Sequence, residues 1–138
     1  MANFNFYTDA NLTVVFSGEW AATQLSNGTS PMATLRLWLG SPTTPGTLQA
    51  ASAPGVDQIT VSIVDLAPSA GHPATELKLA LTEGGLATAT GGSSLNLGTE
   101  IQSGVNNAVS FWIGWKDNTH VLGTSSELSW QTNPLTVV

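Results

Sequence analysis

Cysteine is absent from this 138-residue chain, and charged residues make up only 9% of it. Without cysteine the chain has no disulfide scaffold and no thiolate metal site. An ordinary globular domain carries about 25% charged residues. Three Lys and Arg residues cannot neutralise a phosphate backbone, so the composition excludes nucleic acid as a partner. Most of the surface must therefore be neutral and polar, or covered by another molecule.

Signals for export and for membrane insertion are also missing. The segment Met1–Tyr7 has neither the basic region nor the apolar stretch of a signal peptide. No apolar run approaches the roughly 18 residues of a membrane helix. We therefore expect a protein made in the cytoplasm, without a membrane partner.

The sequence does contain short runs in which apolar and polar residues alternate. In one of them, Ile59, Val61 and Ile63 share a face opposite Thr60 and Ser62. Clusters of Gly, Pro and Asn separate the runs, and helical periodicity is scarce. The pattern predicts one all-β domain over residues 1–138, built as an antiparallel sandwich of about seven to nine strands. Within it we expect an N-terminal arm over 1–16 and a C-terminal strand over 134–138.

The alternating runs also predict which side chains form the core. The expected strands cover residues 3–7, 12–16, 32–39, 59–65, 77–81, 95–97, 109–115, 128–130 and 135–138. Their inward-facing residues are Leu35, Leu37, Leu39, Ile59, Val61, Ile63, Leu77, Leu79, Leu81, Val109, Phe111, Ile113 and Trp115.

Residues that could perform catalysis or bind metal are few and scattered. His72 and His120 lie in expected loops, and we find neither with the i+2 or i+4 partner of a local metal site. We interpret both as exposed loop residues, although two loops could bring them together. The nine acids occur singly, which leaves open a carboxylate pair assembled from distant strands. No P-loop, dinucleotide fingerprint or Gly-x-Ser-x-Gly elbow occurs. We expect no enzyme activity, no cofactor and no metal.

The five tryptophans are the best candidates for a binding surface. Trp115 shares a face with Phe111 and Ile113, so we expect it in the core. Trp38 and Trp112 fall on the faces opposite the apolar rows, where they would reduce solubility if they were left in water. They are therefore packed under a loop, covered by a protein partner, or used to stack on sugar rings.

The N-terminal segment is a second candidate for contact with a partner. Residues 3–7 could add a strand to a neighbouring subunit, with aromatic side chains as anchors. The candidate interface residues are Phe4, Phe6, Tyr7, Trp38 and Trp112.

Several segments between Leu35 and Trp115 form a recognisable series. They are LWLG at 37–40 before a Pro/Gly loop, APGVDQITVSIVD at 53–65, ELKLAL at 76–81, GLATATGG at 85–92, LNLGT at 95–99 and GVNNAV at 104–109. The series resembles small virion structural proteins of tailed bacteriophages that have an immunoglobulin-like β-sandwich fold.

The resemblance implies a fold, a role and partners. It implies an immunoglobulin-like sandwich that acts as a capsid decoration (cement) protein, located on the capsid surface of the virion and made in the host cytoplasm. Its partners would be the major capsid protein and copies of itself, as a homotrimer. Two alternatives stay open: a tail, neck or baseplate protein of the same fold, and a carbohydrate- or host-surface-binding module that uses exposed tryptophans.

Overall fold

The structure, a computed structural model, describes residues 2–120, 123 and 125–138. Met1, the first residue of the expected arm, lies outside the described residues. All sheets in the described part are antiparallel, and the helical elements are three short 3₁₀ turns, which confirms the all-β class. No helix among these residues is long and apolar enough to cross a membrane.

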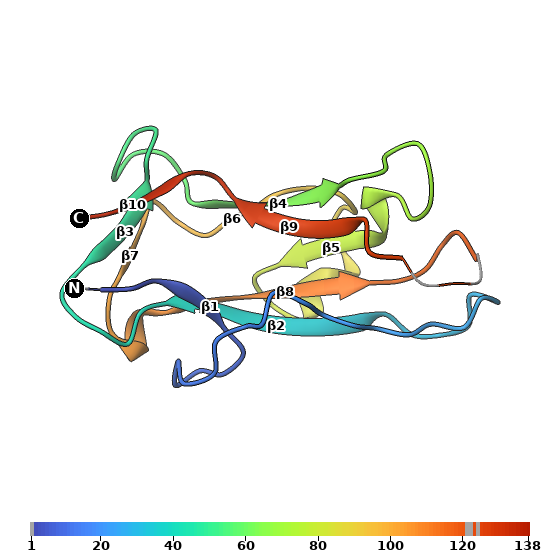
Figure 1. The fold of residues 1–138 in the computed structure, drawn as a ribbon, viewed down its shortest axis with the longest axis horizontal. Helices are drawn as coiled ribbons and strands as arrows, with labels where there is room; N and C mark the ends of the chain where they lie inside the picture. The colour runs from blue at the N-terminus through green and yellow to red at the C-terminus, as the bar shows by residue number, and fades with distance from the viewer. Residues whose placement is uncertain (1, 121–122, 124) are drawn as a thin grey trace.

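The elements follow one another in this order (Figure 1): β1 (Asn5–Tyr7), β2 (Ala33–Gly40), β3 (Thr47–Ala50), β4 (Thr60–Asp65), η1 (Ala74–Glu76), β5 (Leu77–Ala80), η2 (Gly84–Ala87), β6 (Leu95–Asn96), β7 (Glu100–Gln102), η3 (Val105–Asn107), β8 (Val109–Trp115), β9 (Leu128–Thr132) and β10 (Leu135–Val137).

The largest sheet has four strands in the order β1-β2-β8-β5. Its central pair, β2 and β8, is held by seven consecutive residue pairs, from Ala33 opposite Trp115 to Leu39 opposite Val109. Apolar residues alternate along both strands, so one face of the pair points to the core and the other points away. β1 extends the sheet beside β2, and β5 extends it beside β8.

The other two sheets, β10-β3-β7 and β6-β4-β9, line up end to end. β9 pairs with β4, and the strand that follows it, β10, pairs with β3, which precedes β4 in the chain. In the same way, β6 pairs with β4 and the following β7 pairs with β3. Hydrogen bonds bridge the gap, from Asn133 N–H to the Thr60 carbonyl and from Ala51 N–H to the Pro134 carbonyl. The strands are interrupted where Pro134 lacks a donor and where Gly98 has a φ of 111°.

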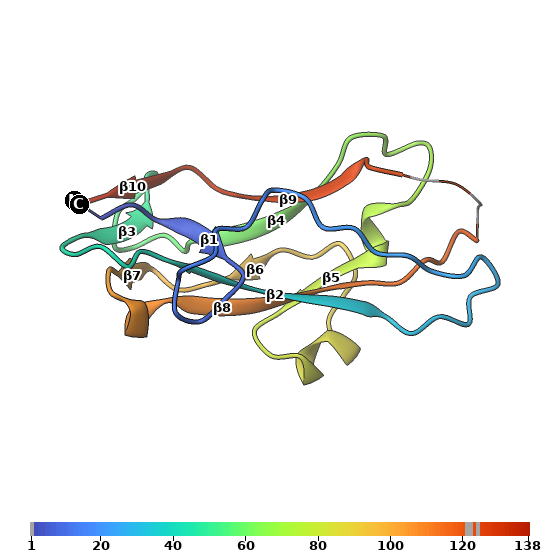
Figure 2. The ribbon, with the colours of Figure 1, turned by 60° about the horizontal axis from the view of Figure 1, so that its bottom comes forward.

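The ten strands therefore form seven longer runs. β6 leads into β7 and β9 into β10, and β3 and β4 lie end to end on either side of the loop of residues 51–59. In both views β9 and β10 lie on one side of the molecule, together with β3 and β4, and β2 and β8 lie on the other side (Figures 1 and 2). The prediction was about seven to nine strands, whereas the described residues form ten, because breaks divide three of the runs in two.

Most of the predicted core residues are buried between these layers. Those that are buried are Leu37, Leu39, Ile59, Val61, Leu77, Leu79, Phe111 and Ile113. Leu35, Ile63, Val109 and Trp115 are partly buried and pack against this cluster. The prediction for Leu81 is wrong, because β5 ends at Ala80 and Leu81 is 52% exposed. Leu48, Leu97 and Ile101 are core residues that the prediction did not include.

The predicted strand over 12–16 is also wrong. The carboxylate of Asp9 accepts hydrogen bonds from the N–H groups of Thr13 and Val14, which folds the segment into a turn. Leu12 stands in this turn with a φ of 55° and is buried. Only Val15 pairs with the sheet, in a single bridge to Tyr7. The prediction did not include β3, although its sequence, TLQA, alternates between polar and apolar residues over four positions and its Leu48 and Ala50 are buried.

A matched pair of leucine substitutions tests this core. Leu37→Ala removes a fully buried side chain and is expected to lower the free energy of unfolding by about 2–5 kcal/mol. Leu81→Ala deletes the same atoms at an exposed position, and is expected to change it by no more than about 0.5 kcal/mol. Urea denaturation followed by tryptophan fluorescence measures both. Equal losses would contradict this placement of the core.

Candidate functional site

The most distinctive surface lies on the four-stranded sheet, on the side turned away from the core. We call this surface the outer face. Strand registers place its side chains in cross-strand rows, since residues directly opposite one another share a face. The rows are Tyr7–Trp38–Ser110, Arg36–Trp112–Ala80 and Thr34–Gly114–Lys78.

The chain covers the two ends of the outer face and leaves its middle open. At one end, Leu12 of the 8–15 turn packs with its Cδ1 3.1 Å from the point where a Cβ on Gly40 would stand. At the other end, Leu86 of η2 lies 3.2 Å from the corresponding point on Gly114. Trp38 and Trp112, which lie between these covers, are only partly buried.

Arg36 lies between the two tryptophans in the open middle. Its guanidinium carbon is 4.5 Å from the Trp38 ring centroid and 5.5 Å from the Trp112 ring centroid, so both rings make cation–π contacts. Its Nη2 donates to Ser110 Oγ at 3.0 Å. The geometry follows from the sheet, because Arg36 and Trp38 are two residues apart on β2 and Trp112 is directly opposite Arg36.

The structure brings together three of the five predicted interface residues: Trp38 and Trp112 flank Arg36, and Tyr7 lies opposite Trp38, where its side chain is buried. The other two, Phe4 and Phe6, pack on the core, and the rings of Phe6 and Phe111 meet edge to face with 5.8 Å between their centroids. β1 (Asn5–Tyr7) pairs with β2 of the same chain, and the N-terminal arm over 1–16 stays a prediction.

Sequence reasoning missed Arg36 as part of this surface, although the signal was present. Arg36 and Trp38 fall on the same side of an alternating strand. What the sequence could not supply was the β2–β8 register, which puts Trp112 beside them. Trp20 and Trp130, by contrast, pack against each other, and Phe16 stacks on Trp130.

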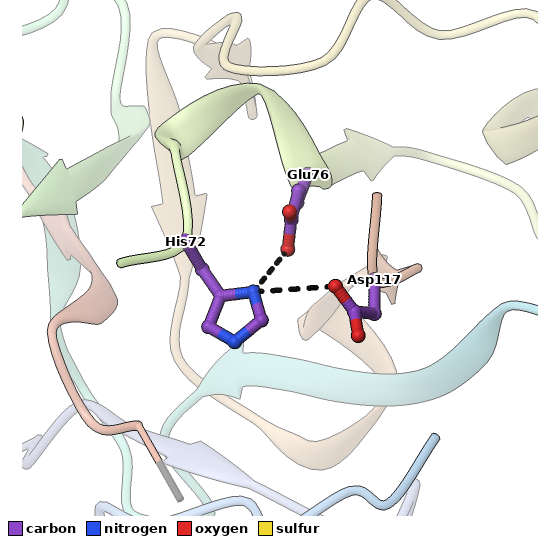
Figure 3. A group of neighbouring side chains, drawn as sticks. All are labelled: His72, Glu76 and Asp117. Carbon is purple, nitrogen blue, oxygen red and sulfur yellow. Dashed lines mark hydrogen bonds and ion pairs between the residues drawn. The ribbon is translucent and has the colours of Figure 1, made fainter. Parts of the chain in front are cut away.

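A second cluster, His72, Glu76 and Asp117, is buried where the loop after β4 meets the segment after β8 (Figure 3). His72 Nδ1 lies 2.8 Å from Glu76 Oε1 and 3.5 Å from Asp117 Oδ1. It is also 2.9 Å from the hydroxyl of Thr119. The interpretation of His72 as an exposed loop residue is therefore wrong, whereas His120 is exposed as expected.

The spacing in the sequence should have revealed this pair. Glu76 stands four residues after His72, the i+4 spacing that we did not find in the sequence. The proline and the short η1 turn between them bring the carboxylate back to the imidazole. Asp117 joins from a distant part of the chain, and no local pattern indicates it.

The potential ligand atoms of this cluster lie within 4.8 Å of one another, so we tested whether they fit a metal ion. Glu76 Oε1 already accepts the indole N–H of Trp115 at 3.1 Å. Asp117 Oδ1 accepts the hydroxyl and N–H of Thr119 and the N–H of His120. A cation would have to compete with these donors. The arrangement fits a hydrogen-bonded clasp in which His72 Nδ1 carries a hydrogen.

Two carboxyl groups around the clasp are held in their charged form. The backbone N–H of His72 donates to Glu127 Oε1 at 2.6 Å, and it lowers the pKa of Glu127 below its ordinary value of 4.5. For Asp117, burial acts to raise the pKa. The hydrogen bonds from His120 and Thr119 outweigh burial, so the pKa of Asp117 lies below its ordinary value of 3.8.

An open hollow of about 590 Å³ lies beside the clasp, and His72, Thr119 and Glu127 contribute to its walls. The hydrogen bonds of His72 among the described residues all involve its backbone N–H or Nδ1. Among the described residues, therefore, no hydroxyl is hydrogen-bonded to Nε2 of His72, which is the arrangement in which a histidine base activates a nucleophile.

Comparison of this chain with protein-family models, with curated proteins and with solved structures finds no match.

Removing the charge of Glu76 tests the clasp. Glu76→Gln puts an amide N–H₂ where a carboxylate oxygen now accepts from Trp115 or Asn118. We expect the free energy of unfolding to fall by about 1–3 kcal/mol. The control is Glu83→Gln, the same change at an exposed position, for which we expect less than about 0.5 kcal/mol. Chemical denaturation at pH 7 distinguishes them, and similar losses would show that Glu76 is not a clasp residue.

Acid should release the same part of the structure. A carboxyl whose pKa is lower in the folded protein than in the unfolded chain contributes stability above the unfolded pKa. This contribution is lost as the pH falls below about 4.5 for Glu127 and below 3.8 for Asp117. We therefore expect the stability gap between wild type and Asp117→Asn to be largest at neutral pH and to narrow by pH 3. A gap that does not change between denaturation series at pH 7 and pH 3 would contradict the hydrogen-bonded role of Asp117.

Proposed function

We propose that this chain is a non-enzymatic structural protein that docks on a larger assembly through its outer face. In its most specific form, the proposal is a capsid decoration protein of a tailed bacteriophage. Such a protein would bind the lattice of the major capsid protein, stabilise the head and associate with copies of itself as a homotrimer. The virion assignment comes from the resemblance of residues 35–115, and the choice of surface comes from the geometry.

The observation that carries the choice of surface is the Arg36 guanidinium between Trp38 and Trp112. Tryptophan and arginine are enriched among the residues that dominate protein–protein binding energy. The cation–π contacts hold the guanidinium in place before binding, so less side-chain entropy is lost when a partner docks. An exposed guanidinium between two partly buried tryptophans is an arrangement suited to a protein interface.

Low charge density fits the same role. Ser, Thr, Gly and Ala together occupy many outward positions where Lys and Glu would normally stand. A decoration protein is present in many copies on a repeating lattice, so contacts that are individually weak add up. Neutral faces can pack against neighbours without the cost of desolvating charges.

The proposal includes an immunoglobulin-like sandwich, in the sense that the strands are divided between two packed layers in the same way. Four runs on one side and three on the other match the four-plus-three division of an immunoglobulin constant-type domain. The neighbours differ, because that fold pairs its second and fifth strands, whereas the second and sixth runs, β2 and β8, are paired here. The run of β3 and β4 pairs with the run of β6 and β7, and β2 pairs with β8, so successive pairs enclose β5. A long hairpin that is rolled up has this order of pairs, which favours a jelly-roll variant of the sandwich.

Two alternatives use the same surface. A tail, neck or baseplate protein would dock by the same contacts at another place in the virion. A carbohydrate-binding module would stack sugar rings on Trp38 and Trp112. The geometry favours this second alternative less, because the Arg36 guanidinium already lies over one face of each tryptophan ring.

The decisive experiment first locates the protein in the virion and then tests whether the outer face is the surface that binds. Mass spectrometry and electron microscopy of particles purified from the source lysate should find the chain on heads. Reconstitution with heads that lack the protein should then require both tryptophans. We expect Trp38→Ala with Trp112→Ala to weaken binding at least about a hundredfold, since hot-spot truncations cost 2 kcal/mol or more each.

The control for this loss is Val56→Ala, an exposed apolar side chain in the turn between β3 and β4, which should leave binding unchanged. Full binding by the double tryptophan variant would overturn the choice of surface. Recovery of the protein with tails but not heads would support the first alternative, and sugar-dependent changes in tryptophan fluorescence would support the second.

A further inference from the structure

The outer face differs in charge from the rest of the protein. The chain has nine acidic and three basic residues, for a net charge of −6. Two of the three basic residues, Arg36 and Lys78, belong to rows of the outer face. No acidic residue occurs in those rows. The strand rows of the outer face therefore carry +2, while Asp9 and Glu83 belong to the two segments that cover its ends. All nine acidic residues lie outside the rows, which leaves the rest of the chain with a charge of −8.

Arg36 has no acidic partner among the residues that the structure describes. Within the described residues the ion pairs are those of His72 with Glu76 and Asp117, and Arg36 takes part in neither. Its one hydrogen bond goes to Ser110 Oγ, so most of its five N–H donors stay available. Lys116, the third basic residue, is used internally, since its ammonium donates to the carbonyls of Gly28 and Ser30.

From this distribution we infer that the outer face recognises a carboxylate on an acidic protein surface, with the Arg36 guanidinium as the fork that binds it. The inference rests on the proposed docking role of this face. A planar guanidinium binds a carboxylate through two parallel N–H donors, which an ammonium cannot do. Trp38 and Trp112 fix the plane of the fork, and Lys78, one row away, adds positive charge.

Charge also decides between possible occupants. Two copies that met through the open middle of the outer face would bring the Arg36 and Lys78 side chains of one copy close to those of the other, so a symmetric self-dimer through this surface is disfavoured. A dense polyanion such as nucleic acid would be repelled by the −8 carried elsewhere. A protein surface with one or two carboxylates at the point of contact satisfies both constraints.

The first test measures the chemistry alone on the full-length protein. The probe is the blocked peptide acetyl-Gly-Glu-Gly-Glu-Gly-amide, and its control has glutamine in place of glutamate. NMR spectra of the five indole N–H groups report where each peptide binds. We expect the glutamate peptide to shift the Trp38 and Trp112 signals, with Trp20 and Trp130 as internal controls that do not move.

Variants of Arg36 identify the fork. Arg36→Gln should weaken the glutamate peptide about tenfold, and Arg36→Lys should restore only part of that loss, because it keeps the charge without the planar donors. Thermal unfolding checks that both variants are folded. Equal binding of the two peptides, or an affinity that Arg36→Gln leaves unchanged, would overturn the inference.

A second test separates this inference from the proposed function. Binding of the protein to purified heads is measured in increasing salt, for wild type and Arg36→Glu. Weaker binding in high salt and a loss of at least about tenfold for the variant support the inference. Strong binding that neither salt nor Arg36→Glu weakens would overturn the inference and keep the proposed function. Peptide binding without any binding to heads would overturn the proposed function and keep the inference.

Discussion

The pairing of β2 with β8 is the constraint on which the rest of the structure depends. Its register places Leu37 opposite Phe111 on the inner side, where both are fully buried, and Arg36 opposite Trp112 on the outer side. Because side chains alternate along a strand, a shift of one residue would turn the core outward and bury the guanidinium. The stability of the domain and the composition of its exposed surface are thus set by the same set of hydrogen bonds.

The clasp of His72, Glu76 and Asp117 solves a separate problem at the far end of the sheet. Long loops leave β4 and β8 there. Partly buried hydrogen bonds to Glu76 from Trp115 and Asn118 connect these loops to each other and to the end of β8. A network in which each polar group is satisfied gives these loops one preferred arrangement.

The sequence predicted the fold class and most of the core, because alternation in β2, β4, β5 and β8 is strong enough to be read locally. It failed where one local contact decides, as at Asp9, whose hydrogen bonds turn an expected strand into a loop. Trp38 and Trp112 could be singled out as outward-facing residues. Their meeting around Arg36, and the contact of Asp117 with His72, depend on pairings between distant segments that no local pattern contains.

The central claim is that the middle of the outer face is covered when the protein is in its assembly. Hydroxyl-radical footprinting of the free and assembled protein tests it most directly, because it reads the exposure of individual side chains. The account predicts that Trp38 and Trp112 are oxidised in the free protein and protected in the assembly, while the exposed Val56 is modified equally in both. Equal oxidation of the two tryptophans in both states would contradict it.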